Sequence, residues 1–360
     1  MARRPTPFPM PYLSRRHLLG TTVTMAVVAP FGRMAAAQED KQVNVYNWDT
    51  YIGSDTVSEF TDATGIKVRY DLFASADELF GKLREGNPGY DVIVPSDNVV
   101  ARMVAANMLI ALDHAKIPNL KNIAPAFTDT PYNEGLRWAA PYFWGTQGIG
   151  YRASTLPTAP TSWRDMTESE ALKGRFSLLE GIYSLRMALK IMGASLDTRN
   201  PAEIEAAADY LIKIKPGIKS FAPDTGQDLL MSGEIDACLE WSGDIKQVAS
   251  EDEDIAYVIP SEGSLLWTDN LAIPTGAPHP DNAHAFIDYI LTPEVHAAIA
   301  TEIGYSCPNE AALPFISPEE RADPAIYPSA ETLSRCEYAT YKGEEIETLY
   351  EKAMTRVLAA

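Results

Sequence analysis

Cysteine is scarce in this chain, and the few cysteines follow no known pattern. The 360 residues include three of them, Cys238, Cys307 and Cys336. An odd number without paired or metal-ligand spacing predicts neither a disulfide framework nor a zinc site. One disulfide remains possible, and the sequence does not favour any pair.

Long apolar runs are also missing. The longest, Leu18 to Pro30, has about 13 residues, whereas a membrane-spanning helix needs roughly 20. It follows a basic segment without acids and precedes Ala35 and Ala37, which have the A-x-A spacing of a signal-peptidase site. We therefore predict a signal peptide at residues 1–37, a periplasmic mature protein and no stable membrane insertion.

The signal contains "SRRHLLG", with Arg15 and Arg16 just before the apolar run. This arrangement resembles a twin-arginine export signal, and a chance arginine pair in a general secretory signal is the alternative. No cysteine lies at the cleavage point, so a lipid anchor is not expected.

Positive charge is in short supply. The chain has 30 lysines and arginines against 49 acids, and five of the arginines would leave with the signal, so 25 against 49 remain, a net charge of −24. Such a surface repels nucleic acid and anionic lipid and attracts cations. Nucleic acid is therefore excluded as a partner.

Enzyme motifs are absent as well. The sequence has no nucleophile elbow, H-E-x-x-H, dinucleotide fingerprint or phosphate loop. Its five histidines never form a helical i, i+4 pair accompanied by an acid, which favours solvated surface histidines. We predict a protein that is not an enzyme and needs no cofactor or metal.

Short β-rich runs alternate with helical segments in the first third of the mature chain. Strands are expected at 43–48, 66–73 and 90–96, and helices begin near Ser54 and at the capping box of Ser75. This order predicts a parallel sheet with right-handed crossovers, whose ligands bind beyond the carboxyl ends of the strands.

A second block of the same kind follows the extended segment 139–152, which has the pattern of a crossing or hinge strand. A strand ending at Trp241 and a return strand at 266–274 are expected next. Helices are predicted at 184–192, from 200 onward, at 281–291 and at 293–303. The fold class is therefore α/β.

Aromatic and acidic residues occur together at the predicted strand ends. The groups are Trp48, Asp49 and Tyr51; Trp241 and Asp244; Trp267 and Asp269; and Tyr305. An indole face attracts an ammonium group by about 0.5–2 kcal/mol and packs against methylene groups, while a carboxylate adds a charge-assisted hydrogen bond. The combination suits a flexible chain of CH₂ groups with terminal amines.

Six segments carry a family resemblance: "NWDTYI", "FTDATGIKV", "YDVIVPS", "PYFWGTQGIGY", "WTDNLAIP" and "EIGYSCPN". In this order they resemble the periplasmic spermidine/putrescine-binding proteins of ABC importers. The resemblance implies a two-lobed periplasmic-binding-protein fold, each lobe a mainly parallel sheet flanked by helices, joined by crossing hinge strands. Lobe 1 would be 41–144 plus 268–315, lobe 2 145–267 plus 316–360, with the polyamine between them. A monomer that docks on a membrane permease is expected.

The resemblance also implies a set of ligand-binding residues. These are Trp48, Asp49, Thr50, Tyr51, Ser96, Asp97, Glu180, Tyr183, Trp241, Asp244, Trp267, Asp269 and Tyr305. The chain departs from the family pattern at three places: Asp49 precedes Thr50, Tyr183 stands where a glutamate is expected, and Ala339 replaces a glutamine that helps to hold the far end of spermidine. Putrescine is therefore expected to be preferred over spermidine.

Two alternatives remain open. The same fold could bind another organic cation, or a ferric ion held by Tyr51, Tyr183 and Tyr305. A secreted hydrolase is the alternative from another class.

Overall fold

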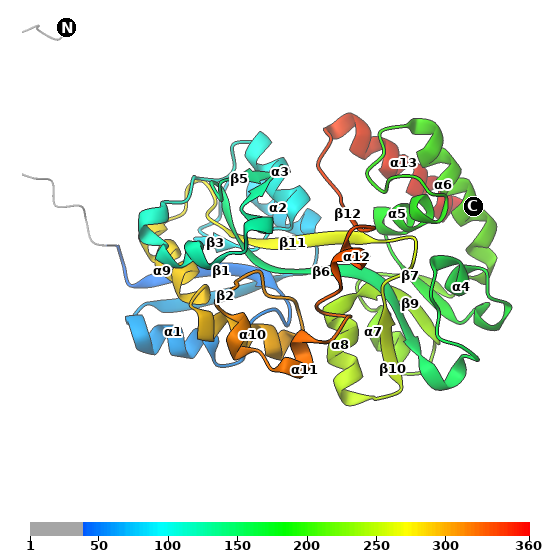
Figure 1. Ribbon diagram of the computed structural model, residues 1–360. Coiled ribbons are helices and arrows are strands. Elements are labelled where there is room, and N and C mark those ends of the chain that lie inside the picture. Colours follow the sequence, from blue (N-terminus) through cyan, green and yellow to red (C-terminus); the bar gives the residue numbers. More distant parts are fainter. Residues whose placement is uncertain (1–38) are drawn as a thin grey trace, which may run out of the picture. The chain divides into compact units, whose positions relative to one another are not determined.

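The computed structural model describes residues 39–360, so the predicted signal peptide and its arginine pair lie outside the described residues. Residues Glu39–Ala360 form one compact α/β unit (Figure 1). Its strands are β1 (Gln42–Trp48), β2 (Lys67–Phe73), β3 (Val92–Ile93), β4 (Asp129–Thr130), β5 (Asn133–Glu134), β6 (Ala139–Arg152), β7 (Phe176–Leu179), β8 (Ser220–Ala222), β9 (Ala237–Trp241), β10 (Ile255–Val258), β11 (Leu265–Ala272) and β12 (Glu337–Tyr338). Its α-helices are α1 (Thr56–Thr64), α2 (Ala76–Arg84), α3 (Asp97–Ala105), α4 (Trp163–Thr167), α5 (Ile182–Ile191), α6 (Pro201–Ile214), α7 (Gly226–Met231), α8 (Ser242–Glu251), α9 (Pro280–Ile290), α10 (Pro293–Ile303), α11 (Pro318–Arg321), α12 (Ala330–Leu333) and α13 (Glu344–Ala359).

The main sheet has the strand order β2-β1-β3-β11-β6-β9-β7-β8. Strands β1, β2 and β3 pair in parallel at one end of this order, and β7, β8 and β9 pair in parallel at the other. The long strands β6 and β11 pair with each other antiparallel and run from one parallel set to the other (Figure 1). The predicted crossing strand at 139–152 and the return strand are thereby confirmed.

Local signals in the sequence set the helix boundaries. Helix α1 ends at Gly65, whose φ of 71° is a left-handed conformation that favours glycine. Helix α2 begins at Ser75, whose side chain accepts a hydrogen bond from the N–H of Glu78 at 3.1 Å. The Glu78 carboxylate accepts from the N–H of Ala74 instead of Ser75, so the predicted capping box is half formed.

The apolar core consists of separate clusters on either side of the crossing strands. Two of them draw their buried residues from 43–143 and 267–316, and two others from 149–255 and 350–357. Trp241 is partly buried and packs against clusters of both groups. It therefore lies where the two parts of the core meet.

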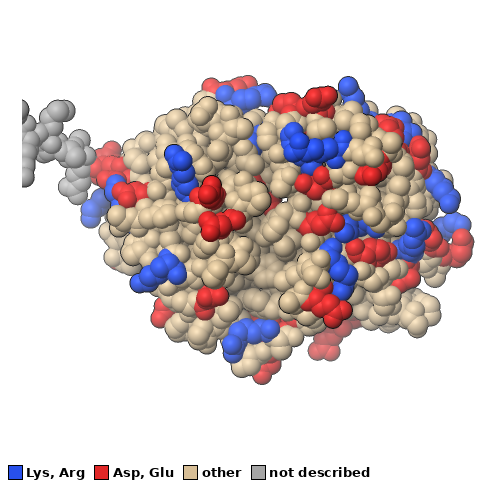
Figure 2. Space-filling model, turned by 45° about the horizontal axis from the view of Figure 1, so that its top comes forward, with Lys and Arg blue, Asp and Glu red and all other residues tan. Residues whose placement is uncertain are grey.

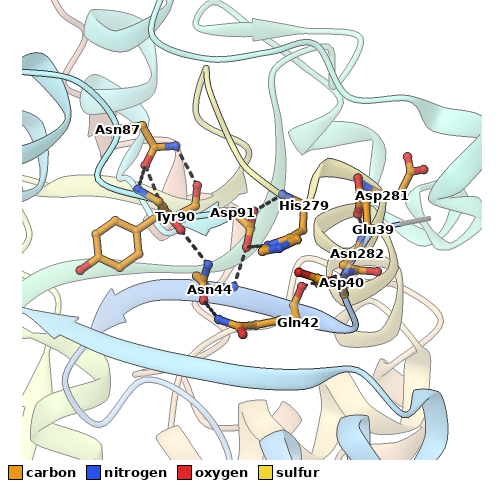
Figure 3. A network of polar contacts seen from close by, with 11 residues as sticks. Glu39, Asp40, Gln42, Asn44, Asn87, Tyr90, Asp91, His279, Asp281 and Asn282 are labelled. Atoms are coloured by element: carbon orange, nitrogen blue, oxygen red, sulfur yellow. Dashed lines mark hydrogen bonds and ion pairs between the residues drawn. The ribbon is translucent and has the colours of Figure 1, made fainter. Parts of the chain in front are cut away.

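A polar network ties the start of the described chain to helix α9 (Figure 3). The carboxylate of Glu39 accepts hydrogen bonds from the N–H groups of Asp281 and Asn282, both at 3.0 Å. It thus caps the helix N-terminus, where unpaired N–H groups and the helix dipole favour an anion. The buried carboxylate of Asp91 accepts from the N–H of Asn44 on β1 and from that of His279 before α9.

The histidines correct one sequence expectation. His284 and His296 are buried rather than solvated. The His284 ring accepts the N–H of Asp113 at 3.0 Å, and the His296 ring contacts the carbonyl of Tyr142 at 2.6 Å. Burial lowers the pKa of His296 to about 4. These partners are distant in sequence, so spacing along the chain could not reveal them.

Charges of both signs are interspersed over the face shown in Figure 2. All three cysteines are free in the described chain, so the possible disulfide is not formed. No helix among residues 39–360 is both long enough and apolar enough to cross a membrane.

Candidate functional site

Five aromatic side chains form a row in which each ring meets the next edge-on; we call it the aromatic row. The ring centroids are 5.2 Å apart for Tyr183 and Trp241 and 5.8 Å apart for Trp241 and Trp267. The distances are 5.2 Å from Trp267 to Tyr305 and 5.4 Å from Tyr305 to Tyr51. The five residues come from five separate segments, so the fold alone brings them together.

Strand ends and helix starts position these rings. Tyr183 is in the first turn of α5, Trp241 ends β9, and Trp267 is in β11. Tyr51 follows β1, and its carbonyl accepts hydrogen bonds from Asn47 and Tyr142.

Tyr305 packs closely on Gly243 of the "WSGD" segment. A Cβ at this glycine would lie 2.2 Å from the tyrosine ring. Any side chain at position 243 would therefore displace Tyr305 from the aromatic row.

Two buried carboxylates, Asp97 at the start of α3 and Asp269 in β11, lie beside the aromatic row; we call them the acid pair. They are 5% and 8% exposed, and a backbone bridge between Ser96 and Asp269 holds the start of α3 against β11. The Oδ2 atom of Asp97 has no hydrogen-bond partner in the described chain. These carboxylates are thus fixed in place but incompletely satisfied.

Burial raises the pKa of both members of the acid pair. The pKa of Asp97 is raised to about 7, although the N–H of Asn98 and the charge of Arg186 act in the opposite direction. The pKa of Asp269 is raised well above its usual range, and the Tyr51 hydroxyl lowers it only in part. No hydrogen bond of acceptable geometry joins that hydroxyl to the carboxylate.

Three further carboxylates, Asp224, Glu240 and Asp244, lie around Trp241; we call them the acid triad. One carboxylate oxygen from each lies within 4.8 Å of the other two. Asp244 accepts a hydrogen bond from the Tyr305 hydroxyl at 2.8 Å, and Asp224 accepts one from the Trp241 indole N–H at 2.8 Å.

Burial is the main cause that raises the pKa of every member of the triad. The residue Asp224 is exposed as a whole, and its carboxylate accepts the Trp241 indole N–H. The charge of Asp224 in turn raises the pKa values of Glu240 and Asp244. Like charges held together in this way favour the arrival of a cation.

None of these five carboxylates forms an ion pair with lysine, arginine or histidine within residues 39–360. Buried acids are normally paired or bound to a cation. Arg186 is close enough to affect the pKa of Asp97, and its guanidinium carbon is 5.9 Å from the centre of the Tyr183 ring. The site as a whole therefore suits a cationic ligand with apolar segments between its charges.

The remaining predicted residues do not join the aromatic row or the acids. Trp48 packs on Phe73 and donates its indole N–H to the Val94 carbonyl at 3.0 Å. Asp49 and Thr50 are exposed in a turn, where Thr50 has a φ of 49°.

Glu180 is exposed, and the Ser96 hydroxyl donates to Asn98. A role of these two residues in ligand binding, like that of the Trp48 turn, stays a prediction.

Sequence reasoning missed Asp224 and Glu240. Asp224 follows β8 at the same edge of the sheet as Trp241, and recognising the short strand "SFA" would have placed it there. Glu240 is the acid in the otherwise buried strand "ACLEW" and is completely buried. An acid at a core position of a strand was the available signal.

A cavity of about 380 Å³ lies at the junction of α8, α10 and α11. It shares only Tyr305 with the aromatic row, and its lining includes Lys246, Gln247 and Glu302. The cavity is therefore distinct from the acid pair and the acid triad.

Comparison with known proteins gives a consistent result. Residues 55–328 match the family model described as bacterial extracellular solute-binding protein. The chain is 35% identical to the putrescine-binding periplasmic protein SpuD of Pseudomonas aeruginosa, over 93% of this chain and 96% of that protein. It is 33% identical to the spermidine/putrescine-binding periplasmic protein of Escherichia coli, with 96% and 98% covered.

Among solved structures, the spermidine/putrescine ABC transporter substrate-binding protein PotD from Streptococcus pneumoniae is similar. The TM-score is 0.81 at 31% identity, and the match covers 89% of this chain and 99% of that one.

Proposed function

We propose a function from one established premise: this chain belongs to the bacterial extracellular solute-binding protein family. The function is to capture a linear polyamine in the periplasm, putrescine or spermidine, and to deliver it to the membrane permease of an ABC importer. The named relatives are periplasmic putrescine- and spermidine-binding proteins.

One observation carries the proposal: the aromatic row is flanked by five carboxylates that have no basic partner in the described chain. Indole and phenol rings attract ammonium groups and pack against methylene groups. Buried carboxylates favour charged hydrogen-bond donors. A polyamine supplies the ammonium groups and the methylene groups in one molecule.

The two lobes are proposed to be 41–144 with 268–315 and 145–267 with 316–360. The separate apolar clusters on either side of β6 and β11 support this division. Contacts such as the one between Arg102 on α3 and Glu344 on α13, 3.4 Å apart, would then link the lobes when they close. Binding would occur in a monomer.

A ferric site is disfavoured by the tyrosines themselves. Iron binds phenolate, and burial raises the pKa of Tyr183 to about 12 and those of Tyr51 and Tyr305 well above their usual value. The Tyr305 hydroxyl also donates to Asp244. These tyrosines are thus held in the protonated form.

We propose that the protein binds and releases its ligand without chemistry. The family is one of solute-binding proteins, and the sequence contains none of the nucleophile motifs that a hydrolase would need. A turnover assay with amide, ester and glycoside substrates separates the two classes, because a binder gives no product.

The first prediction concerns binding itself. Adding putrescine or spermidine to the mature protein is expected to change its tryptophan fluorescence, because Trp241 and Trp267 are in the aromatic row. Neutral sugars and acidic amino acids should give no change. Affinity should fall with added salt, because salt screens the attraction between the acidic protein and the cation. Unchanged tryptophan fluorescence with every polyamine would contradict the proposed function.

The second prediction concerns ligand length. Ala339 is buried and packs in one apolar cluster with Tyr183 and Trp241, where an amide would otherwise be available for a third amine. Calorimetry should therefore give tighter binding of putrescine than of spermidine. Spermidine binding at least tenfold tighter would contradict this preference while leaving the polyamine class intact.

A further inference from the structure

Arg186 on α5 is a buried cation that has no ion-pair partner. The residue is 4% exposed, and its Nε–H group has no hydrogen-bond partner in the described chain. The Asp97 carboxylate is near enough to feel the charge of Arg186. Within residues 39–360, however, no carboxylate forms an ion pair with the guanidinium. Buried charges are normally paired, so packing alone does not account for an arginine here.

The guanidinium of Arg186 lies at the Tyr183 end of the aromatic row. Tyr183 precedes Arg186 by three residues on α5, which puts both side chains on the same face of the helix. The guanidinium carbon is 5.9 Å from the centre of the Tyr183 ring, a distance at which a cation and an aromatic ring attract each other. The last ring of the row therefore already has a cation of the protein beside it.

The surroundings of the guanidinium are apolar or positive. Arg186 lines a small space together with Lys190, Leu196 and Leu265, and no acid is among the residues that line this space. The two leucines pack in one apolar cluster with Ala339. An ammonium group that arrived here would meet positive charge and hydrocarbon, and no carboxylate.

A polyamine longer than a diamine extends toward this end of the row, because the other end is blocked. The ring of Tyr51 packs edge-on against Tyr142 and Phe143, which are both completely or almost completely buried. The aminopropyl arm of spermidine adds about 5 Å to an extended diamine, since each bond advances the chain by about 1.25 Å. Neighbouring rings are separated by a similar distance, 5.2 Å for Trp241 and Tyr183. The third amine therefore lies about one ring further along the row than the second.

We propose that Arg186 is a specificity-determining residue that restricts the polyamine site to diamines, an inference that rests on the proposed function. Its guanidinium repels the third ammonium group of spermidine at the Tyr183 end of the row. The two ammonium groups of putrescine lie further from the guanidinium and nearer to the acid pair and the acid triad, so putrescine binding is affected much less.

The third prediction tests this role with Arg186→Gln, which removes the charge and keeps a polar side chain. Spermidine affinity should rise at least tenfold and putrescine affinity at most threefold, measured by calorimetry. Arg186→Lys keeps the charge and should leave both affinities within threefold of the wild type. Arg84→Gln is the matched control, because it removes an exposed arginine at the end of α2, and it should also change neither affinity by more than threefold. Melting curves check that each variant folds.

A matched pair of ligands tests the same repulsion in the wild-type protein. N-propylputrescine has the spermidine chain without the terminal amine, so it lacks only the group that faces the guanidinium. The wild type should bind N-propylputrescine at least tenfold more tightly than spermidine, and Arg186→Gln should reduce this ratio at least tenfold. The comparison in the wild type decides the proposal even where a variant fails to fold.

Several results would overturn the role of Arg186. Equal gains for putrescine and spermidine in Arg186→Gln, or no gain for either, would do so, as would an equal spermidine gain in Arg186→Lys. Equal wild-type affinities for spermidine and N-propylputrescine would also contradict it. Tighter binding of 4-aminobutyrate than of putrescine, lost in Arg186→Gln, would replace the proposal with an arginine that binds a carboxylate. Polyamine binding by the wild type keeps the proposed function standing in the first three cases, whereas a wild type that binds no polyamine contradicts the proposed function itself.

Discussion

Replacing Asp269 with asparagine is expected to weaken putrescine binding by two to four orders of magnitude. The carboxylate is 8% exposed and is fixed through the backbone bridge to Ser96. In the complex it would be the buried partner of an ammonium group. Removing one partner of a buried ion pair costs about 3–5 kcal/mol, and each 1.4 kcal/mol is about tenfold in Kd.

The large loss of affinity follows from the groups that Asp269→Asn leaves in the site. An asparagine has nearly the same shape, so the contact with Tyr51 is retained, but the charge is lost and one carboxylate oxygen becomes an NH₂ group that cannot accept from the ammonium. Water cannot reach the site easily to replace the lost oxygen, because Asp97 and Asp269 are both buried. The ammonium would be left without its charged partner.

Calorimetry of the mature protein at pH 8 measures the change, and Asp62→Asn is the control. Asp62 is exposed on α1, and Asp62→Asn removes the same charge from a surface position outside the aromatic row. Its affinity should stay within threefold of the wild type. An Asp269→Asn variant that keeps wild-type affinity would show that the ligand lies elsewhere.

The sequence was informative where local patterns determine structure. Gly65 ends a helix because of its backbone conformation, and the apolar segment 139–152 is a single crossing strand, as its pattern indicates. Trp241 and Trp267 were recognised because each occurs with an acid, Asp244 and Asp269, and Tyr305 because its segment resembles the family pattern; the sheet topology then brings these segments together.

The sequence was less informative where a role depends on contacts between distant segments. Trp48 lies at a strand end like Trp241, yet it packs on Phe73 of the neighbouring strand. The direction of a side chain at the end of a strand depends on the neighbouring strand and the turn, and spacing alone does not contain this information. Glu240 was missed for the same reason, since its importance comes from Asp224 and Asp244.

The raised pKa values of the acids near the aromatic row also predict that ligand binding depends strongly on pH. Burial raises the pKa of Asp97 to about 7, and that of Asp244 is also raised. A bound dication favours the ionised carboxylates, so below these pKa values each proton must leave as the ligand binds. The ligand's amines keep their charge throughout this range, because alkyl ammonium groups have pKa values near 10.

Putrescine affinity should therefore fall about 50-fold for each released proton between pH 7 and pH 5, with a slope that approaches tenfold per pH unit below the pKa. If Asp97 and one member of the triad both release a proton, the total fall is about 2,500-fold. Calorimetry in buffers of different ionisation enthalpy counts the protons directly. Affinity that stays constant or rises on acidification would contradict the predicted role of these acids.

The stability of the ligand-free protein should change in the opposite direction. The pKa of Asp97 is about 7 in the folded chain and about 3.9 in the unfolded chain, so the folded state binds more protons between these values. This stabilisation is fully present below about pH 4 and is lost as the pH rises through about 7. The melting temperature of the ligand-free protein should thus fall from pH 5 to pH 8, whereas saturating putrescine should stabilise it more at pH 8 than at pH 5. In Asp97→Asn, one proton fewer should be released on ligand binding, and both the melting temperature and the stabilisation by putrescine should depend less on pH. If neither pH dependence changes in this variant, the protons belong to other groups.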